Sequence, residues 1–330
     1  MLLNMYCYRL NHFARINSNG TISRCGHMTN APQFQSLADM EASKWLKDTH
    51  LSMSQNIWPN ECIRCKEVEQ IGNKSIRQNF LYTHLMHKDS RSDYIVLSGV
   101  LDNVCNSACQ TCNDQYSTKI GSLQGKGYIK INNSDALRKL PLDRIVQLDI
   151  NGGEPSASKN YLNLLQNLPS NVRSIRINTN CARIIDEVVL LVDKGIKIII
   201  TASLDGIGRI HDYLRWPIQW SEFEKNLMIY QNMPGVEINT WTTVSALNIG
   251  DFKNILNYVS SHSLPHSWAL LEEPSVLSIK HSNHLTRAAD VPDILKSIVA
   301  SGKDNNADLQ AFTHNQDKLR HITLEDYFSK

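Results

Sequence analysis

The sequence predicts an α/β protein, because segments typical of strands and of helices alternate from about residue 93 onward. The strand candidates lie at 94–100, 144–150, 172–178, 196–204, 236–244 and 267–271. The helix candidates between them have apolar residues at helical spacing, at 158–168, 182–195, 221–233 and 251–262. Six such units suit a partial (βα)6, TIM-like barrel, in which ligands bind at the carboxyl ends of the strands.

Residues 1–90 lack this alternation of strand and helix segments, and they hold four of the eight cysteines. An Asn-Gly pair within 13–23 predicts a hairpin. Helical spacing predicts one helix over about 36–47 and another over 75–87. We therefore expect three parts, which are a small Cys-rich hairpin-plus-helix module at 1–90, the barrel at 91–275 and a helical C-terminal extension at 276–330.

The composition is that of an ordinary globular protein. The net charge of +2 gives no strong signal for binding nucleic acid or an anionic membrane. No apolar run reaches the roughly 18 residues of a membrane span, and the N-terminal stretch MLLNMYCYRLNHFAR is too short and interrupted for a signal peptide. We expect a cytoplasmic protein, in whose reducing environment closely spaced cysteines are metal ligands more often than disulfides.

Three closely spaced cysteines form the first motif. Cys105, Cys109 and Cys112 have Cys-x3-Cys-x2-Cys spacing and follow the first strand candidate. A short loop can point all three thiolates at one metal centre. They could hold three irons of a 4Fe–4S cluster and leave the fourth iron open, as a catalytic site requires. From these cysteines alone, a zinc site remains an alternative.

Polar motifs follow the next three strand candidates. The first is Asn151–Pro155 (NGGEP), the second is Asn178–Asn180 (NTN) and the third is Ser203–Gly206 (SLDG), which precedes His211, Asp212 and Arg215. Because the carboxyl ends of barrel strands lie at one edge, we expect these motifs to share one site with the three cysteines. Each motif alone could equally be an ordinary turn at a strand end.

Taken together and in this order, the four motifs resemble those of the radical S-adenosylmethionine superfamily over about residues 95–275. The cofactor-binding residues that this resemblance implies are Gly152, Gly153, Glu154, Asn178, Asn180, Ser203, Asp205 and Arg215. Glu154 would help to hold the amino group of S-adenosylmethionine. Ser203 and Arg215 would contact its carboxylate or ribose, since the planar fork of arginine suits a carboxylate.

Two residues depart from the pattern of the superfamily. Thr111 precedes the third cysteine, where the superfamily usually has an aromatic residue or Met, so the adenine contacts there are left undefined. Cys181 stands where the superfamily often has Gly, and we expect it to be a small buried hydrophobe. We expect His211 and Asp212 to orient the loop near the cofactor rather than to act as acid and base.

The N-terminal cysteines form a second pattern. Cys7 and Cys25, with Gly20 between them, and the later pair Cys62 and Cys65 resemble the SPASM and twitch modules, which carry an auxiliary iron–sulfur cluster. Here the module would precede the barrel instead of following it. The resemblance implies that the four thiolates ligate a second 4Fe–4S cluster, and a four-cysteine zinc site is the alternative.

The resemblance also implies a reaction. The open iron binds S-adenosylmethionine, one electron from the reduced cluster cleaves it, and the resulting 5′-deoxyadenosyl radical takes a hydrogen atom from the substrate. The electron would come from a donor such as flavodoxin or ferredoxin. The expected substrate is a peptide or protein side chain, with a small molecule such as a sugar or nucleoside as the alternative. A non-enzymatic zinc-binding module would account for the cysteines but not for the strand-end motifs.

Overall fold

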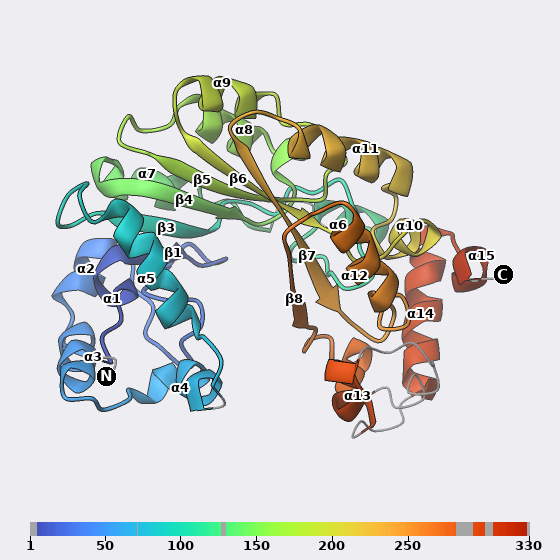
Figure 1. Ribbon diagram of the computed structural model, residues 1–330, viewed down its shortest axis with the longest axis horizontal. Coiled ribbons are helices and arrows are strands. Elements are labelled where there is room, and N and C mark those ends of the chain that lie inside the picture. The colour runs from blue at the N-terminus through green and yellow to red at the C-terminus, as the bar shows by residue number, and fades with distance from the viewer. Residues whose placement is uncertain (1–4, 71, 127–129, 282–292, 301–305, 329–330) are drawn as a thin grey trace. The chain divides into compact units, whose positions relative to one another are not determined.

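The structure is a computed structural model that describes residues 5–70, 72–126, 130–281, 293–300 and 306–328. Its strands form one eight-stranded sheet in the order β2-β1-β3-β4-β5-β6-β7-β8 (Figure 1). The strands are β1 (Phe13–Ile16), β2 (Ile22–Ser23), β3 (Ile95–Val100), β4 (Ile145–Asn151), β5 (Ser174–Thr179), β6 (Lys197–Ser203), β7 (Val236–Val244) and β8 (His266–Leu270). The predicted α/β class is confirmed, and β3 to β8 are the six predicted strands.

Helices connect the strands, and those predicted between them are confirmed as α8, α9, α11 and α12. The helices are α1 (Arg9–His12), α2 (Leu37–Ala42), α3 (Lys44–Ser54), α4 (Ile63–Gln70), α5 (Ile76–His87), α6 (Thr118–Leu123), α7 (Ser134–Arg138), α8 (Lys159–Gln166), α9 (Glu187–Asp193), α10 (Arg209–Leu214), α11 (Trp220–Gln231), α12 (Phe252–Ser261), α13 (Asp293–Ala300), α14 (Asn306–Arg320) and α15 (Leu324–Phe328). Among the described helices, none combines the length and apolar character that crossing a bilayer requires.

The prediction of one helix over 36–47 is wrong, because two helices meet at Ser43. Ser43 is extended (φ −64°, ψ 143°), and its amide donates to Met40 O at the end of α2. Its hydroxyl accepts from Leu46 N at 3.2 Å and thereby caps α3. Both helices bury apolar residues, so their combined spacing imitates one longer helix.

The predicted N-terminal hairpin is confirmed, since β1 and β2 pair antiparallel. Gly20 takes a positive φ of +80° in the turn, and Asn17 N donates to Thr21 O at 2.8 Å. The structure adds that β1 also pairs in parallel with β3, from Phe13↔Val96 onward. The hairpin therefore extends the main sheet, which the sequence did not reveal because parallel pairing between distant segments leaves no local pattern.

Packing divides the chain into two compact units. The first comprises Met1–Asp102, Ile131–Gly152 and Asn163–Arg176, and the second comprises Asn103–Lys130, Gly153–Leu162 and Ile177–Lys330. The four N-terminal cysteines fall in the first unit and the Cys-x3-Cys-x2-Cys motif falls in the second. The division at residues 90 and 275 stays a prediction, and parts of its C-terminal segment (282–292, 301–305 and 329–330) lie outside the described residues.

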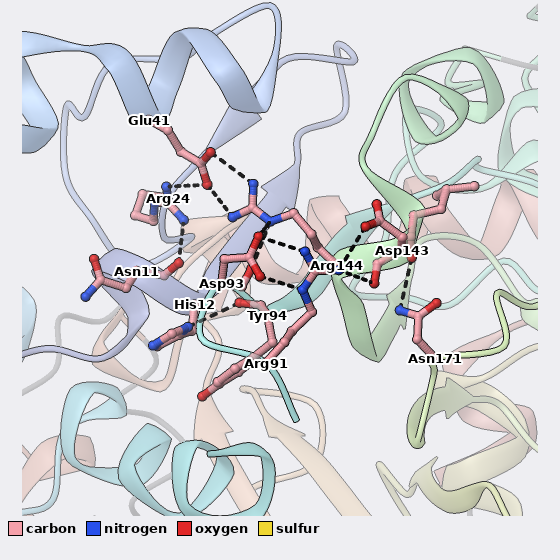
Figure 2. Close-up of polar contacts among 11 residues, drawn as sticks. Asn11, His12, Arg24, Glu41, Arg91, Asp93, Tyr94, Asp143, Arg144 and Asn171 are labelled. Carbon is pink, nitrogen blue, oxygen red and sulfur yellow. Dashed lines mark hydrogen bonds and ion pairs between the residues drawn. The ribbon is translucent and has the colours of Figure 1, made fainter. Parts of the chain in front are cut away.

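In the first unit, α1 and α5 pack beside β1 and β3 (Figure 1). A network of arginine and carboxylate side chains joins α2 to the residues before β3 and β4 (Figure 2). Arg144 donates to both carboxylate oxygens of Glu41, at 2.8 and 3.0 Å, and to Asp93 O at 2.8 Å. Arg24 is 1% exposed, donates to Phe13 O at 2.7 Å and pairs with the same Glu41 at 3.8 Å. The negative charge of Glu41 therefore interacts with the positive charges of two arginines.

We expect Arg144→Met to lower the free energy of unfolding by about 2 kcal/mol, because it removes a two-bond pair from a partly buried carboxylate. Urea unfolding followed by circular dichroism measures the change. The matched control is Lys44→Met, which removes an ion pair whose side chains are 87% and 56% exposed. That pair should contribute no more than about 0.5 kcal/mol. Equal losses in the two variants would contradict the role of the network.

In the second unit, β6, β7 and β8 pair in parallel. Figure 1 shows α10 beside α15, which follows α14. The buried residues of α14 recur at helical spacing and are Leu309, Thr313, Asp317 and Arg320. The face that α14 buries is therefore apolar at its start and charged at its end, where Arg320 bonds to Ala108 and Cys109 of the Cys-x3-Cys-x2-Cys segment.

Candidate metal centres

The loop from Cys105 to Cys112 belongs to the second unit and has a fixed backbone. Thr118, at the start of α6, accepts a hydrogen bond from Cys105 N at 3.0 Å and donates to Cys105 O at 3.1 Å. Two amides in the middle of the loop donate to carbonyls at the end of α10 and just after it, Gln110 N to Leu214 O at 2.9 Å and Ala108 N to Trp216 O at 2.7 Å. These bonds bring the start of α6 and the end of α10 to the loop.

Two of the three thiols of the loop lie close to one hydroxyl. Ser107 Oγ is 3.3 Å from Cys105 Sγ and 3.5 Å from Cys109 Sγ. Burial, followed by the neighbouring thiol groups, raises the pKa of Cys105 to about 11 and the pKa of Cys112 to about 12. A bound cation reverses such shifts, because it stabilises thiolates.

The three loop cysteines are free thiols, so their chemistry fits the donor set of a 4Fe–4S cluster with one open iron. Among the residues that the structure describes, no group of three or more His, Cys, Asp or Glu side chains is arranged to hold a metal ion. Thr111, beside the third cysteine, is half-buried.

The NGGEP turn approaches the cysteine loop at Gly153. A Cβ on Gly153 would lie 2.0 Å from Val104 O, so only glycine fits there. The next amide, Glu154 N, donates to that same carbonyl at 2.7 Å. Gly152 has a positive φ of 135°, which also favours glycine. The backbone alone thus requires both glycines of the motif.

The carboxylate of Glu154 is 2% exposed and accepts four hydrogen bonds within the second unit. They come from Thr179 Oγ1 at 2.7 Å, Asn180 N at 2.7 Å, Ser156 Oγ at 2.8 Å and Ser156 N at 3.1 Å. Burial raises the pKa of Glu154, although these four hydrogen bonds lower it. Glu154 therefore ties the NGGEP turn to the NTN turn, a role that the sequence did not indicate.

The NTN turn contacts the cysteine loop. Asn180 Nδ2 donates to Asn106 Oδ1 at 2.8 Å, and Ser107 Oγ lies 3.4 Å away. Asn178 is half-buried near the end of β5. Cys181 is fully buried at a positive φ of 53°, and burial raises the pKa of its thiol. These properties agree with the expectation that Cys181 is a small buried hydrophobe.

The SLDG turn reaches the loop through Arg215. Asp205 is 3% exposed, accepts from Thr243 N at 2.8 Å and pairs with Arg215 Nε at 2.8 Å. Arg215 Nη1 lies 3.5 Å from Cys109 Sγ. Burial opposes the charge of Arg215, but Asp205 and Cys109 raise its pKa above the usual value. Ser203 is half-buried at the end of β6. The arrangement places a fixed cation beside one of the loop thiols.

His211 is fully buried, with ring centroids 4.3 Å from Phe223 and 5.5 Å from Trp220. Asp212 accepts from Trp220 N at the start of α11, and His211 packs against the ring of the same tryptophan. Burial, followed by the charge of Arg215, lowers the pKa of His211 to about 3. The imidazole is therefore neutral in the folded protein at neutral pH.

The low pKa of His211 predicts a loss of stability in acid. The unfolded chain gains a proton on this histidine below about pH 6.5, whereas the folded chain does not until about pH 3. The contribution of the neutral His211 to the free energy of unfolding is complete above pH 6.5 and falls by about 2 kcal/mol by pH 5. We expect His211→Leu to lose less stability between pH 7 and pH 5 than the wild type by this amount in urea unfolding. The exposed His314 provides the control substitution, and equal acid losses in wild type and His211→Leu would contradict the assignment.

The four N-terminal cysteines line one small cavity in the first unit. Cys7 precedes α1, Cys25 follows β2, Cys62 ends the 3-10 turn η1 (Asn60–Cys62), and Cys65 lies in α4. Burial first and neighbouring thiols second raise the pKa of Cys7 to about 11, and burial also raises the pKa of Cys62 and Cys65. Four free thiols from four segments at one cavity fit the donor set of a metal centre.

The residues after Cys65 brace this cavity. Arg77 makes two bonds to Glu69, at 2.6 and 3.0 Å, and donates to Tyr6 O at 3.0 Å, next to Cys7. Ser75 also donates to Glu69, at 2.6 Å, and caps α5. These bonds hold the start of α5 to both the N-terminal segment and α4.

Three residues of the sites were absent from the sequence-based prediction, namely Ser107, Thr118 and Arg320. Ser107 stands inside the cysteine motif, and a hydroxyl between two thiols was an available signal. Ser117–Thr118 is typical of a helix start and could have been found by its capping pattern. Arg320 has no local signal, because its partners lie far away in the sequence.

No family profile and no curated protein matches the sequence. Solved structures similar to the chain include three of one protein. All are of SuiB from Streptococcus suis, one bound to the precursor peptide SuiA, one bound to S-adenosylmethionine and one described as SuiB. The complex with SuiA is 13% identical, covers 94% of this chain and 69% of SuiB, and has a TM-score of 0.38. The complex with S-adenosylmethionine is 14% identical, covers 94% and 69%, and has a TM-score of 0.39. The third structure is 14% identical, covers 84% and 56%, and has a TM-score of 0.41. Similarities with TM-scores this low carry no argument about function.

Proposed function

We propose that the protein is a radical S-adenosylmethionine enzyme whose catalytic 4Fe–4S cluster is held by Cys105, Cys109 and Cys112. The observation that supports this most is the convergence within the second unit. The NGGEP turn bonds to Val104, directly before the cysteine loop, and to the NTN turn. The NTN turn bonds to the loop itself, and Arg215, after the SLDG turn, lies against Cys109. A plain zinc site needs only thiolates and gives no reason for these turns to meet at the loop.

When bound, the cluster supplies the electron that cleaves S-adenosylmethionine and so provides the radical for hydrogen abstraction. The residues of the chain bind and orient. The three thiolates hold the cluster, Thr118 fixes the backbone of Cys105, and Arg215 keeps a positive charge beside Cys109. The same proposal includes Asn178 and Ser203 as cofactor contacts and β3 to β8 as a partial barrel.

Anaerobic reconstitution with iron and sulfide tests the proposal. The protein should turn brown and, given S-adenosylmethionine and a strong reductant, should release 5′-deoxyadenosine measurable by chromatography. Colourless protein that holds stoichiometric zinc and forms no cleavage product would contradict the proposal and favour a zinc-binding module.

We further propose that Cys7, Cys25, Cys62 and Cys65 hold a second 4Fe–4S cluster, as in a twitch-like module. The thiol-lined cavity and its bracing by Arg77 support this. Cys62→Ala with Cys65→Ala should reduce the iron content to about half, because one of two similar clusters is lost. Cys181→Ala is the matched control and should leave iron unchanged. Unchanged iron in the double variant would show that these cysteines bind none.

For the substrate we propose a peptide or protein side chain, a class taken from the superfamily that the motifs resemble, with flavodoxin or ferredoxin as the donor. A sugar or nucleoside is the alternative small-molecule class. Substrate-dependent formation of 5′-deoxyadenosine distinguishes them, because release should rise only with the correct class. Stimulation by nucleosides and by no peptide would overturn the preference.

A further inference from the structure

The C-terminal end of α14 is bonded directly to the cysteine loop. Arg320 is 1% exposed, and its Nε donates to Ala108 O at 2.7 Å while its Nη2 donates to Cys109 O at 3.0 Å. Its Nη1 donates within its own helix to the carbonyl and side-chain oxygens of Gln316, at 2.8 and 2.6 Å. One guanidinium thus joins two successive carbonyls of the loop to α14.

This contact determines how a peptide unit of the loop is turned. A trans peptide is planar, and its N–H points opposite to its carbonyl. Because Arg320 holds the carbonyl of Ala108, the amide of Cys109 points away from α14. The neighbouring amide of Gln110 is held separately by Leu214 O. Arg320 therefore fixes the orientation of the peptide that carries the central thiol of the motif.

Arg320 is itself held in place by α10. Tyr213 on α10 donates to Asp317 Oδ1 at 2.9 Å, and Asp317 Oδ2 accepts from Leu324 N at 2.7 Å. Asp317 lies almost one turn before Arg320 on the same helix. The residue after Tyr213 is Leu214, whose carbonyl already holds the loop. Helices α10 and α14 are therefore hydrogen-bonded both to each other and to the cysteine loop.

We propose that Arg320 is a positioning residue for the candidate catalytic cluster, which orients the Cys109 peptide and keeps a fixed positive charge beside the loop. This inference rests on the proposed function. A buried positive charge near a cluster stabilises its reduced form, which is the more negative one, and so raises its midpoint potential. Orientation and charge can be separated, because lysine keeps the charge but cannot bridge two carbonyls.

The first test uses the full-length protein without iron. Hydrogen exchange of the segment 108–112 should accelerate at least about tenfold in Arg320→Met and in Arg320→Lys, because both lose the bridge. Lys318→Met, which removes an exposed cation from the same helix, should not change it. Tyr213→Phe removes a hydrogen bond to Asp317 and leaves Arg320 in place, so it should lower thermal stability with a smaller change in exchange. Unchanged exchange in both Arg320 variants would overturn the positioning role, whether or not the protein proves to bind a cluster.

The second test uses the reconstituted protein and a redox titration followed by electron paramagnetic resonance. Arg320→Met should move the midpoint potential of one cluster to a more negative value, while Arg320→Lys should leave it near that of the wild type. A purely structural role predicts the same potential in all folded variants. If Arg320→Met does not fold, a more negative potential in Arg320→Lys would overturn the role assigned to charge. A wild type that binds no iron refutes the proposed function instead, and the exchange result then stands by itself.

Discussion

Replacing Cys105, Cys109 and Cys112 together by alanine is expected to abolish release of 5′-deoxyadenosine, with a loss of at least about 10⁴-fold. The rate enhancement of an enzyme of this kind depends on the group that the loop holds, because the chain itself contributes binding and orientation. Quantification of the nucleoside after anaerobic incubation measures the effect.

The same variant should keep its fold, since alanine is tolerated at the positions of small buried side chains. The free energy of unfolding of the iron-free protein should change by no more than about 1 kcal/mol per site. Cys181→Ala serves as the control for loss of a buried thiol in the same unit and should retain activity. Cleavage that survives the triple substitution would refute the assignment of these ligands.

Glu154→Gln is expected to have the second largest effect. Of the two carboxylate oxygens, Oε1 accepts from Thr179 and Ser156, and Oε2 accepts from Asn180 N. An amide nitrogen in the place of Oε2 would face the Asn180 N–H, so two donors would oppose each other in a buried site. We expect a loss of about 3 kcal/mol in the free energy of unfolding. Activity should fall by about 10²-fold, because the NTN turn is displaced from the cysteine loop.

Thr179→Val is the comparison, because it leaves the carboxylate with three of its four donors, although it also removes the hydroxyl that accepts from Cys181 N. It should lower stability by about 1 kcal/mol and reduce activity much less than Glu154→Gln. Denaturant unfolding and the cleavage assay on the same samples separate the two effects. A Glu154→Gln variant that loses activity at unchanged stability would show instead that the carboxylate acts directly on a ligand.

Much of the fold could be predicted because local patterns determine it. Strand β3 is an almost continuously buried apolar run, β7 and β8 are rich in β-branched and aromatic residues, and the amphipathic helices between the strands have a clear period. The predictions failed where a single side chain or a distant partner decides. Ser43 breaks a helix by using its hydroxyl as a cap, and β1 joins β3 through pairing that no local pattern records.

The candidate site shows the same limit. Spacing was enough to select the cysteines and the strand-end turns, because those residues carry their chemistry in the side chain. The role of Glu154 could not be predicted, since the donors that surround its carboxylate come from the NTN turn. The role of Arg320 could not be predicted for the same reason, because only the folded chain brings α14 to the loop.

The distance along the chain between Arg320 and its partners has a consequence for the order of folding. The two carbonyls that it binds are 212 and 211 residues away. Closing so long a segment is slow and costs chain entropy, so contacts of this kind form late. Three thiols that lie within eight residues of sequence therefore gain their final geometry only after α14, near the other end of the described chain, has docked. Before α14 docks, the central peptide of the loop is still free to rotate, so a metal would bind to an unformed site. We therefore expect metal binding at this site to follow the folding of α14.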